Sequence, residues 1–169
     1  MSFLDAFRGE FTHEAATTRK MLERAPMDKG EWRPHQKSMT LKQLVSHIAE
    51  IPQWAQRTVQ MSEMSLDMAN YKPTLYGTTN ELLAAFDKAV QNASQLLGEL
   101  REESLGETWR LKVDGKVVLE MPRAVVLRAM TLNHMIHHRG QLCLYLRLLN
   151  VKVPTVYFNT ADNPTFIFE

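Results

Sequence analysis

The chain has little cysteine, no long apolar run and almost no excess of charge of either sign. Its single cysteine, Cys143, excludes an intramolecular disulfide and a cysteine-rich zinc site. Twenty Lys and Arg residues against nineteen Asp and Glu give a formal net charge of +1. Because the basic residues are scattered, we expect no nucleic-acid partner. No apolar stretch approaches the roughly 18 residues of a membrane span, and the first residues lack a signal peptide's basic and apolar segments. We therefore expect a reduced, cytoplasmic protein with no membrane partner.

The length and the apolar pattern predict one helical domain. With 169 residues, the chain is close to a typical domain of about 150, and we expect a single domain over residues 1–169. Apolar residues recur at three- and four-residue steps in four segments, which predicts four amphipathic helices. We expect Pro52 to kink the second of them just past His47, because proline removes an amide donor and crowds the preceding turn. The predicted helices cover about residues 3–22, 41–62, 79–100 and 122–150.

A short β-hairpin is predicted between the third and fourth helices. Trp109, Leu111 and Val113 alternate with polar residues, and Asp114-Gly115 favours the positive φ angles of a tight turn. Residues 63–77 are polar and interrupted by proline and glycine, so they are predicted to be a loop. Asn150 is an acceptable terminator for the last helix, and the aromatic tail after it is predicted to pack across the helices. The predicted fold class is all-α, a four-helix bundle with a small β-hairpin before the last helix.

The last predicted helix places several polar side chains on its apolar face. At about 100° per residue, His138 lies about 40° from His134, with Gln141 and Tyr145 about 20° to either side of His134. Apolar residues share this face, so these four side chains point into the bundle. Arg139 lies on the far side of the helix, and we expect it to be an ion-pair partner at the surface or at an interface.

The second predicted helix also directs a histidine toward the core, because His47 shares its stripe with Ile51 and Trp54. Three neutral imidazoles with an open fourth position form an established catalytic zinc arrangement, and imidazole also suits nickel, copper and iron. The alternative is three core histidines held by hydrogen bonds. That alternative is costly, because each buried unpaired nitrogen costs about 1–3 kcal/mol, and a shared metal ion would satisfy three nitrogens at once.

Two motifs carry a resemblance to a known family. Residues 32–48 read W-R-P-H-x-K-S-M-T-L-x-x-L-x-x-H-I and residues 134–141 read H-x-x-x-H-R-G-Q. In this order and in a four-helix pattern, they resemble the DinB family, also called DinB/YfiT-like metalloenzymes. The resemblance implies an up-down-down-up bundle, commonly a homodimer, that holds one divalent ion per chain, nickel or zinc. The ligands it implies are His47, His134 and His138.

His137 competes with His138 for the third ligand position. The helical wheel favours His138, because it is a full turn from His134 whereas His137 lies at the edge of the stripe.

The sequence supports two classes of function. The first is a metal-dependent hydrolase or thiol transferase. The resemblance implies that a low-molecular-weight thiol can take part, and we expect a small-molecule substrate, which no motif identifies. The alternative is a non-catalytic, metal-stabilised homodimer that acts in binding or in a stress response. Possible pocket residues are Trp54, Gln141 and Tyr145. Core packing is the favoured explanation for Trp54 and Tyr145, and Gln141 fits a polar bundle end equally well.

Overall fold

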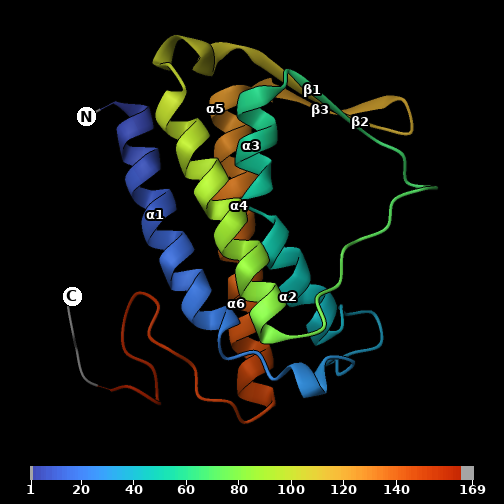
Figure 1. Ribbon diagram of the computed structural model, residues 1–169, viewed down its shortest axis with the longest axis vertical. Coiled ribbons are helices and arrows are strands. Elements are labelled where there is room, and N and C mark those ends of the chain that lie inside the picture. The colour runs from blue at the N-terminus through green and yellow to red at the C-terminus, as the bar shows by residue number, and fades with distance from the viewer. Residues whose placement is uncertain (1, 165–169) are drawn as a thin grey trace.

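Four long helical segments lie side by side in the structure, a computed structural model that describes residues 2–164 (Figure 1). Two of the segments are single helices, and the other two are built from shorter helices in succession. This confirms the prediction of a mainly helical chain with four helical segments. The segments are α1 (Phe3–Leu22), α2 and α3 (Leu41–Glu50 and Gln53–Gln60), α4 (Thr79–Glu99), and α5, a π-helix and α6 (Arg123–Val126, Leu127–Asn133 and His134–Leu148).

The starts of three helices follow directly from the local sequence. Ser2, Thr40 and Thr78 each accept a hydrogen bond from the backbone three residues later, and the side chain at that third position bonds back. These capping boxes satisfy amide groups that have no partner inside the helix. Two short 3-10 helices, Met27–Lys29 and Glu102–Gly106, lie in the connections.

Pro52 breaks the second segment more completely than predicted. The expected kinked helix over residues 41–62 is two helices, and Pro52 is the residue before α3. Proline has no amide hydrogen to donate to the carbonyl of Ile48, and the amide of Ile51 bonds that carbonyl instead at 3.2 Å. The break leaves His47 on the last turn of α2.

The packing of the segments places α2 against α6. The α2–α3 segment packs against α4 on one side and against the last segment, which contains α6, on the other. Helix α1 packs against the same two neighbours. The loop after α3 runs back along the outside of the bundle, so α4 runs in the same direction as α2 and α3 (Figure 1). The main core between the helices is apolar; its fully buried members include Phe7, Phe11, Leu44, Ile48, Phe86 and Leu146.

A three-stranded sheet lies at one end of the bundle, in the order β1 (Glu63–Leu66), β2 (Thr108–Val113) and β3 (Lys116–Pro122). Strands β2 and β3 are antiparallel, and Asp114 and Gly115 between them have φ of 48° and 78°. Strand β1 pairs in parallel with β2. The prediction of a loop over residues 63–77 was therefore wrong at its start. The strand is only four residues long and its partner lies more than 40 positions away, so local pattern could not reveal it.

The last helix ends as the sequence predicted. Asn150 has a φ of 59°, and the amides of Asn150 and Val151 donate to the carbonyls of Arg147 and Leu146. This pair of bonds is a Schellman motif, which satisfies carbonyls left open at the helix end. The segment beyond it returns along α1 and buries Val153 in the core. The part of the tail prediction that concerns residues 165–169 lies outside the described residues.

None of the described helices combines the length and the apolar character that crossing a membrane requires.

Candidate metal centre

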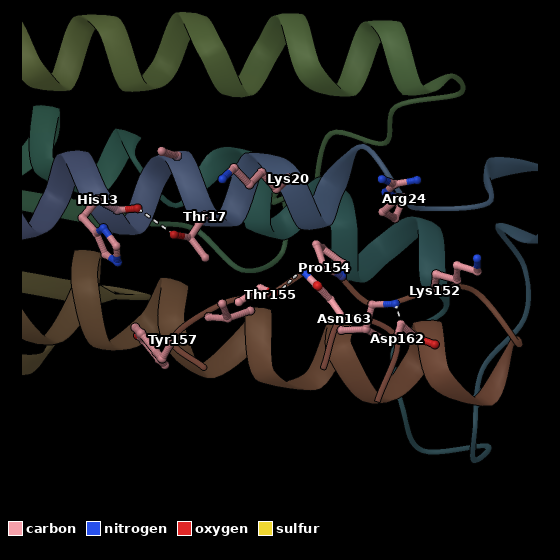
Figure 2. Close-up of a pocket in the computed structure, with 13 residues that line it drawn as sticks. His13, Thr17, Lys20, Arg24, Lys152, Pro154, Thr155, Tyr157, Asp162 and Asn163 are labelled. Atoms are coloured by element: carbon pink, nitrogen blue, oxygen red, sulfur yellow. Dashed lines mark hydrogen bonds between the residues drawn. The ribbon is translucent and has the colours of Figure 1, made fainter. Parts of the chain in front are cut away.

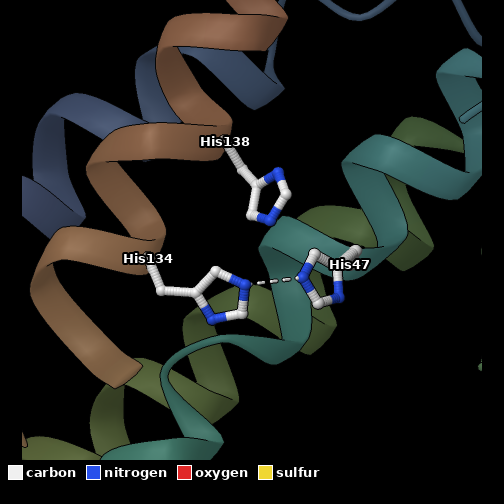
Figure 3. A group of neighbouring side chains, drawn as sticks. All are labelled: His47, His134 and His138. Carbon is white, nitrogen blue, oxygen red and sulfur yellow. Dashed lines mark hydrogen bonds between the residues drawn. The ribbon is translucent and has the colours of Figure 1, made fainter. Parts of the chain in front are cut away.

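Three histidines from two helices meet between α2 and α6 (Figure 3). His47 lies on α2, His134 is the first residue of α6, and His138 follows one turn later. The Nε2 atoms of His47 and His134 are 3.0 Å apart. The ring centroids lie 4.9 Å (His47–His134), 4.6 Å (His47–His138) and 4.8 Å (His134–His138) apart. The three rings therefore form a nearly equilateral group.

The bundle positions these rings by ordinary core packing. Leu44 and Ile48 lie on either side of His47 along α2 and are fully buried, and Met135 and Leu142 are buried on α6. Burial of these side chains, each worth about 1.5–3 kcal/mol, fixes the rotation of both helices. The polar rings are consequently held at the helix contact rather than released to solvent.

The environment keeps all three rings neutral at neutral pH. The pKa values of His47 and of His134 are lowered from 6.5 to about 4, and burial is the largest cause. The neighbouring rings contribute to this lowering, because two adjacent imidazolium groups would repel one another. Burial also lowers the pKa of His138. Neutral imidazole is the form that binds a metal ion, so the rings are ready to act as ligands without first losing a proton.

The geometry fits a single divalent ion. One ligand nitrogen from each ring lies within 4.8 Å of the others. Two nitrogens that each bind a zinc ion at about 2.1 Å in tetrahedral geometry lie roughly 3.4 Å apart. Without an ion, the 3.0 Å contact of His47 with His134 allows only one of the two facing nitrogens to carry a proton. The three histidines can therefore bind a metal ion together, as the sequence predicted for this group.

Gln141 fixes the orientation of His138. Its Oε1 lies 2.8 Å from Nδ1 of His138, and its Nε2 lies 3.1 Å from Nε2 of His137. An amide oxygen only accepts, so the proton of His138 sits on Nδ1 and its Nε2 presents a lone pair. Metal-binding histidines commonly have such a partner on the second nitrogen. Gln141 was singled out in the sequence as a pocket residue; the structure places it as the partner of two neighbouring rings.

The π-helix Leu127–Asn133 leads directly into His134. At its end, the backbone amide of His134 donates to the carbonyls of Ala129 and Thr131. In a regular α-helix this amide would donate to the carbonyl of Met130. Nδ1 of His134 is buried and has no hydrogen-bond partner of good geometry among residues 2–164. The Met130 carbonyl still lies close enough to oppose, in part, the lowering of the His134 pKa. π-Helical turns occur often at functional sites, and this one sets the rotation of His134.

Trp54 and Tyr145, the other possible pocket residues, both have structural partners. Trp54 packs in a second apolar cluster at the sheet, with its ring 6.2 Å from that of Trp109. Tyr145 is buried, its hydroxyl donates to the Met39 carbonyl at 3.0 Å, and its ring lies 5.4 Å from that of Trp32. Their part in a substrate pocket stays a prediction.

Arg139 is an ion-pair partner, as predicted, but the pair is buried and the surface alternative was wrong. Its side chain is only 3% exposed and pairs with the 6% exposed carboxylate of Glu14 on α1 at 2.5 Å. The hydroxyl of Tyr157 accepts from Arg139 at 2.6 Å and donates to Glu14 at 2.9 Å. The helical wheel gave the direction correctly, because Arg139 does point away from His134. That direction faces α1 and the C-terminal segment, not solvent.

Comparisons with known proteins agree with this structure. The sequence profile of the DinB family matches residues 1–165. The fold is similar to the crystal structure of a DinB-like protein from Bacillus cereus, with 20% identity, a TM-score of 0.71, and 90% of this chain and 97% of that chain covered. It is also similar to a DinB-like protein from Bacillus subtilis, with 19% identity, a TM-score of 0.67, and coverage of 89% and 96%. No curated protein matches the sequence. With nearly its whole length matched by the family profile, the chain belongs to the DinB family.

Proposed function

We propose that this protein is a metal-dependent enzyme of the hydrolase or thiol-transferase type, acting on a small molecule. In this proposal His47, His134 and His138 hold one divalent ion per chain, nickel or zinc. The observation that carries the proposal is the convergence of three neutral imidazoles from two helices on one point. Three protein ligands are typical of catalytic zinc sites, whereas structural sites usually have four.

The described residues around the centre indicate how it would act. When bound, the ion supplies a Lewis acid that lowers the pKa of a coordinated water or thiol. The cluster of candidate ligands contains three histidines and no carboxylate among residues 2–164. Neutral rings would leave the charge of the ion uncompensated, so the site favours anionic substrate groups, of which a low-molecular-weight thiolate is one. Gln141 would hold His138 with its Nε2 toward the ion.

The assembly belongs to the same proposal. We infer one domain over residues 1–169, an up-down-down-up bundle, a homodimer and a cytoplasmic location, with neither nucleic acid nor membrane as a partner. The parallel course of the α2–α3 segment and α4 supports the bundle order. The near-neutral net charge of +1 supports the absence of a nucleic-acid partner.

Cobalt substitution tests whether the centre has an open position. Azide and 2-mercaptoethanol are added separately to the Co²⁺-loaded protein, and its visible spectrum is recorded. The proposal predicts that both change the spectrum and that the thiol adds a sulfur-to-cobalt charge-transfer band. The His134→Ala variant is expected to show neither change. A cobalt spectrum that neither compound alters would mean a closed centre, which contradicts the enzymatic proposal and favours a metal-stabilised, non-catalytic homodimer in binding or stress response.

A further inference from the structure

A cavity of about 640 Å³ lies between α1 and the segment that follows α6, away from the three histidines (Figure 2). Its volume falls within the range of about 300–1,000 Å³ that is usual for small-molecule sites. One wall is a single face of α1, and the other is the chain between Lys152 and Asn163. The residues of α1 that line it are His13, Ala16, Thr17 and Lys20, and Arg24 lies in the turn just after the helix.

Three basic side chains line this cavity. Lys20 on α1 and Arg24 in the turn after it are both exposed, and Lys152 lies on the opposite wall. Within the part of the chain that the structure describes, none of the three forms an ion pair. These charges are therefore available to a ligand.

The single carboxylate among the lining residues is already engaged. Asp162 pairs with Arg147 at 2.7 Å and accepts from the amide of Val153 at 2.9 Å. The Val153 amide is the largest cause of its lowered pKa, and Arg147 and Lys152 contribute. Asp162 thus remains ionised, and Arg147 offsets its charge. The cavity keeps a net positive character.

The cavity also has an apolar and aromatic side. Val153 is 2% exposed, and Pro154, Val156 and Tyr157 line the wall beside it. Tyr157 is fixed by its hydrogen bonds to Glu14 and Arg139, and the Arg139 guanidinium lies 5.1 Å from the centre of its ring. This wall is anchored by a buried ion pair, so it is preformed.

We propose that this cavity binds a small organic anion that has an apolar or aromatic body, such as an aromatic carboxylate, sulfonate or phosphate. Lys20, Arg24 and Lys152 would contact the anionic group, and the wall of Val156 and Tyr157 would contact the body. The site is distinct from the metal centre, because its lining comes from α1 and the C-terminal segment rather than from α2 and the histidine face of α6. The proposal does not depend on the proposed enzymatic function.

The test uses the full-length protein and two fluorescent probes of the same shape, anionic 8-anilinonaphthalene-1-sulfonate and uncharged N-phenyl-1-naphthylamine. We expect the anionic probe to bind saturably at one site per chain, at least tenfold more tightly than the uncharged one. The double variant Lys20→Ala/Arg24→Ala should weaken the anionic probe about tenfold. The control Lys88→Ala/Lys116→Ala removes two exposed lysines outside the cavity that form no ion pair among residues 2–164, and should bind like the parent.

Four results would overturn the proposal. Equal affinity for both probes would show that the charge of the probe does not contribute to binding. An equal loss of affinity for the anionic probe in both double variants would show that the net charge of the protein, and not the cavity, attracts it. Loss of binding in His134→Ala would place the probe at the metal centre instead. Binding only after deletion of residues 165–169 would assign the cavity to the chain's own C-terminus.

Discussion

Removing the amide of Gln141 should weaken metal binding without harming the fold. Gln141 lies at the surface of α6, and its Oε1 is 2.8 Å from Nδ1 of His138. Gln141→Leu leaves Nδ1 without its acceptor, so the ring is free to rotate and to move its proton to Nε2, where it blocks the ligand lone pair. Gln141→Glu keeps an acceptor in place and makes it anionic, which strengthens the bond. Leucine and glutamate both have high helix propensity, so α6 should persist in either variant.

The size of the effect follows from the exposure of the residue. Loss of such an outer partner typically costs about 10–100-fold in metal affinity. Water reaches Gln141 and can replace part of the lost hydrogen bond, so we expect the lower end, about tenfold or ~1.4 kcal/mol. We expect Gln141→Glu to bind at least as tightly as the parent protein.

The assay is competition for zinc with a chromophoric chelator at neutral pH. A matched control is Gln95→Leu, which alters an exposed glutamine of α4 that bonds only to Glu99 among residues 2–164. Parental affinity in Gln141→Leu, or an equal loss in Gln141→Leu and Gln141→Glu, would refute the positioning role of this side chain.

Three further outcomes are expected. Glu14→Ala should lower the free energy of unfolding in urea by about 3–5 kcal/mol, because it leaves Arg139 buried and unpaired; a cost under ~1 kcal/mol would contradict this. The metal-free protein should lose stability as pH falls from 6.5 toward 4, because the unfolded chain takes up protons there while folded His47 and His134 do not. The loss should be about 1 kcal/mol per ring after allowance for partial exposure; a flat profile would disagree. A chelator should lower the melting temperature of the zinc-loaded parent protein but not of His134→Ala, and equal shifts in both would count against the assigned ligands.

Helix positions were predictable because their signals are local. Capping boxes at Thr40 and Thr78 mark helix starts in the sequence itself, and Asn150 marks the end of α6 by its tolerance of positive φ. The grouping of His47 with His134 and His138 was also predictable, because helical periodicity directed all three toward the bundle interior.

The remaining features depend on contacts between distant parts of the chain. Strand β1 exists because it pairs with β2, more than 40 residues later, and its four residues carry no pattern of their own. Arg139 is buried because the C-terminal segment returns to α1 and brings Tyr157 over it. A helical wheel reports the direction of a side chain but not what the fold places there.

The sequence contained a signal for the role of Gln141 that the helical-wheel analysis did not bring out. Gln141 follows His138 by three residues, a spacing at which side chains of one helix make contact. The wheel grouped Gln141 with His134 on the inward face, whereas the structure shows its amide bonded to His138 and His137. The three-residue spacing between His138 and Gln141 was therefore a better guide to the partner of Gln141 than its angle on the helical wheel.

The most direct test of the account is the metal content of single-histidine variants, measured by elemental analysis after loading with zinc and removal of excess ion. The account predicts one ion per chain in the parent protein and in His137→Ala, which removes the exposed neighbouring ring. It predicts loss of the ion in His47→Ala, His134→Ala and His138→Ala. Full occupancy in any of these three variants, or loss of the ion in His137→Ala, would contradict the claim that these three rings share one cation.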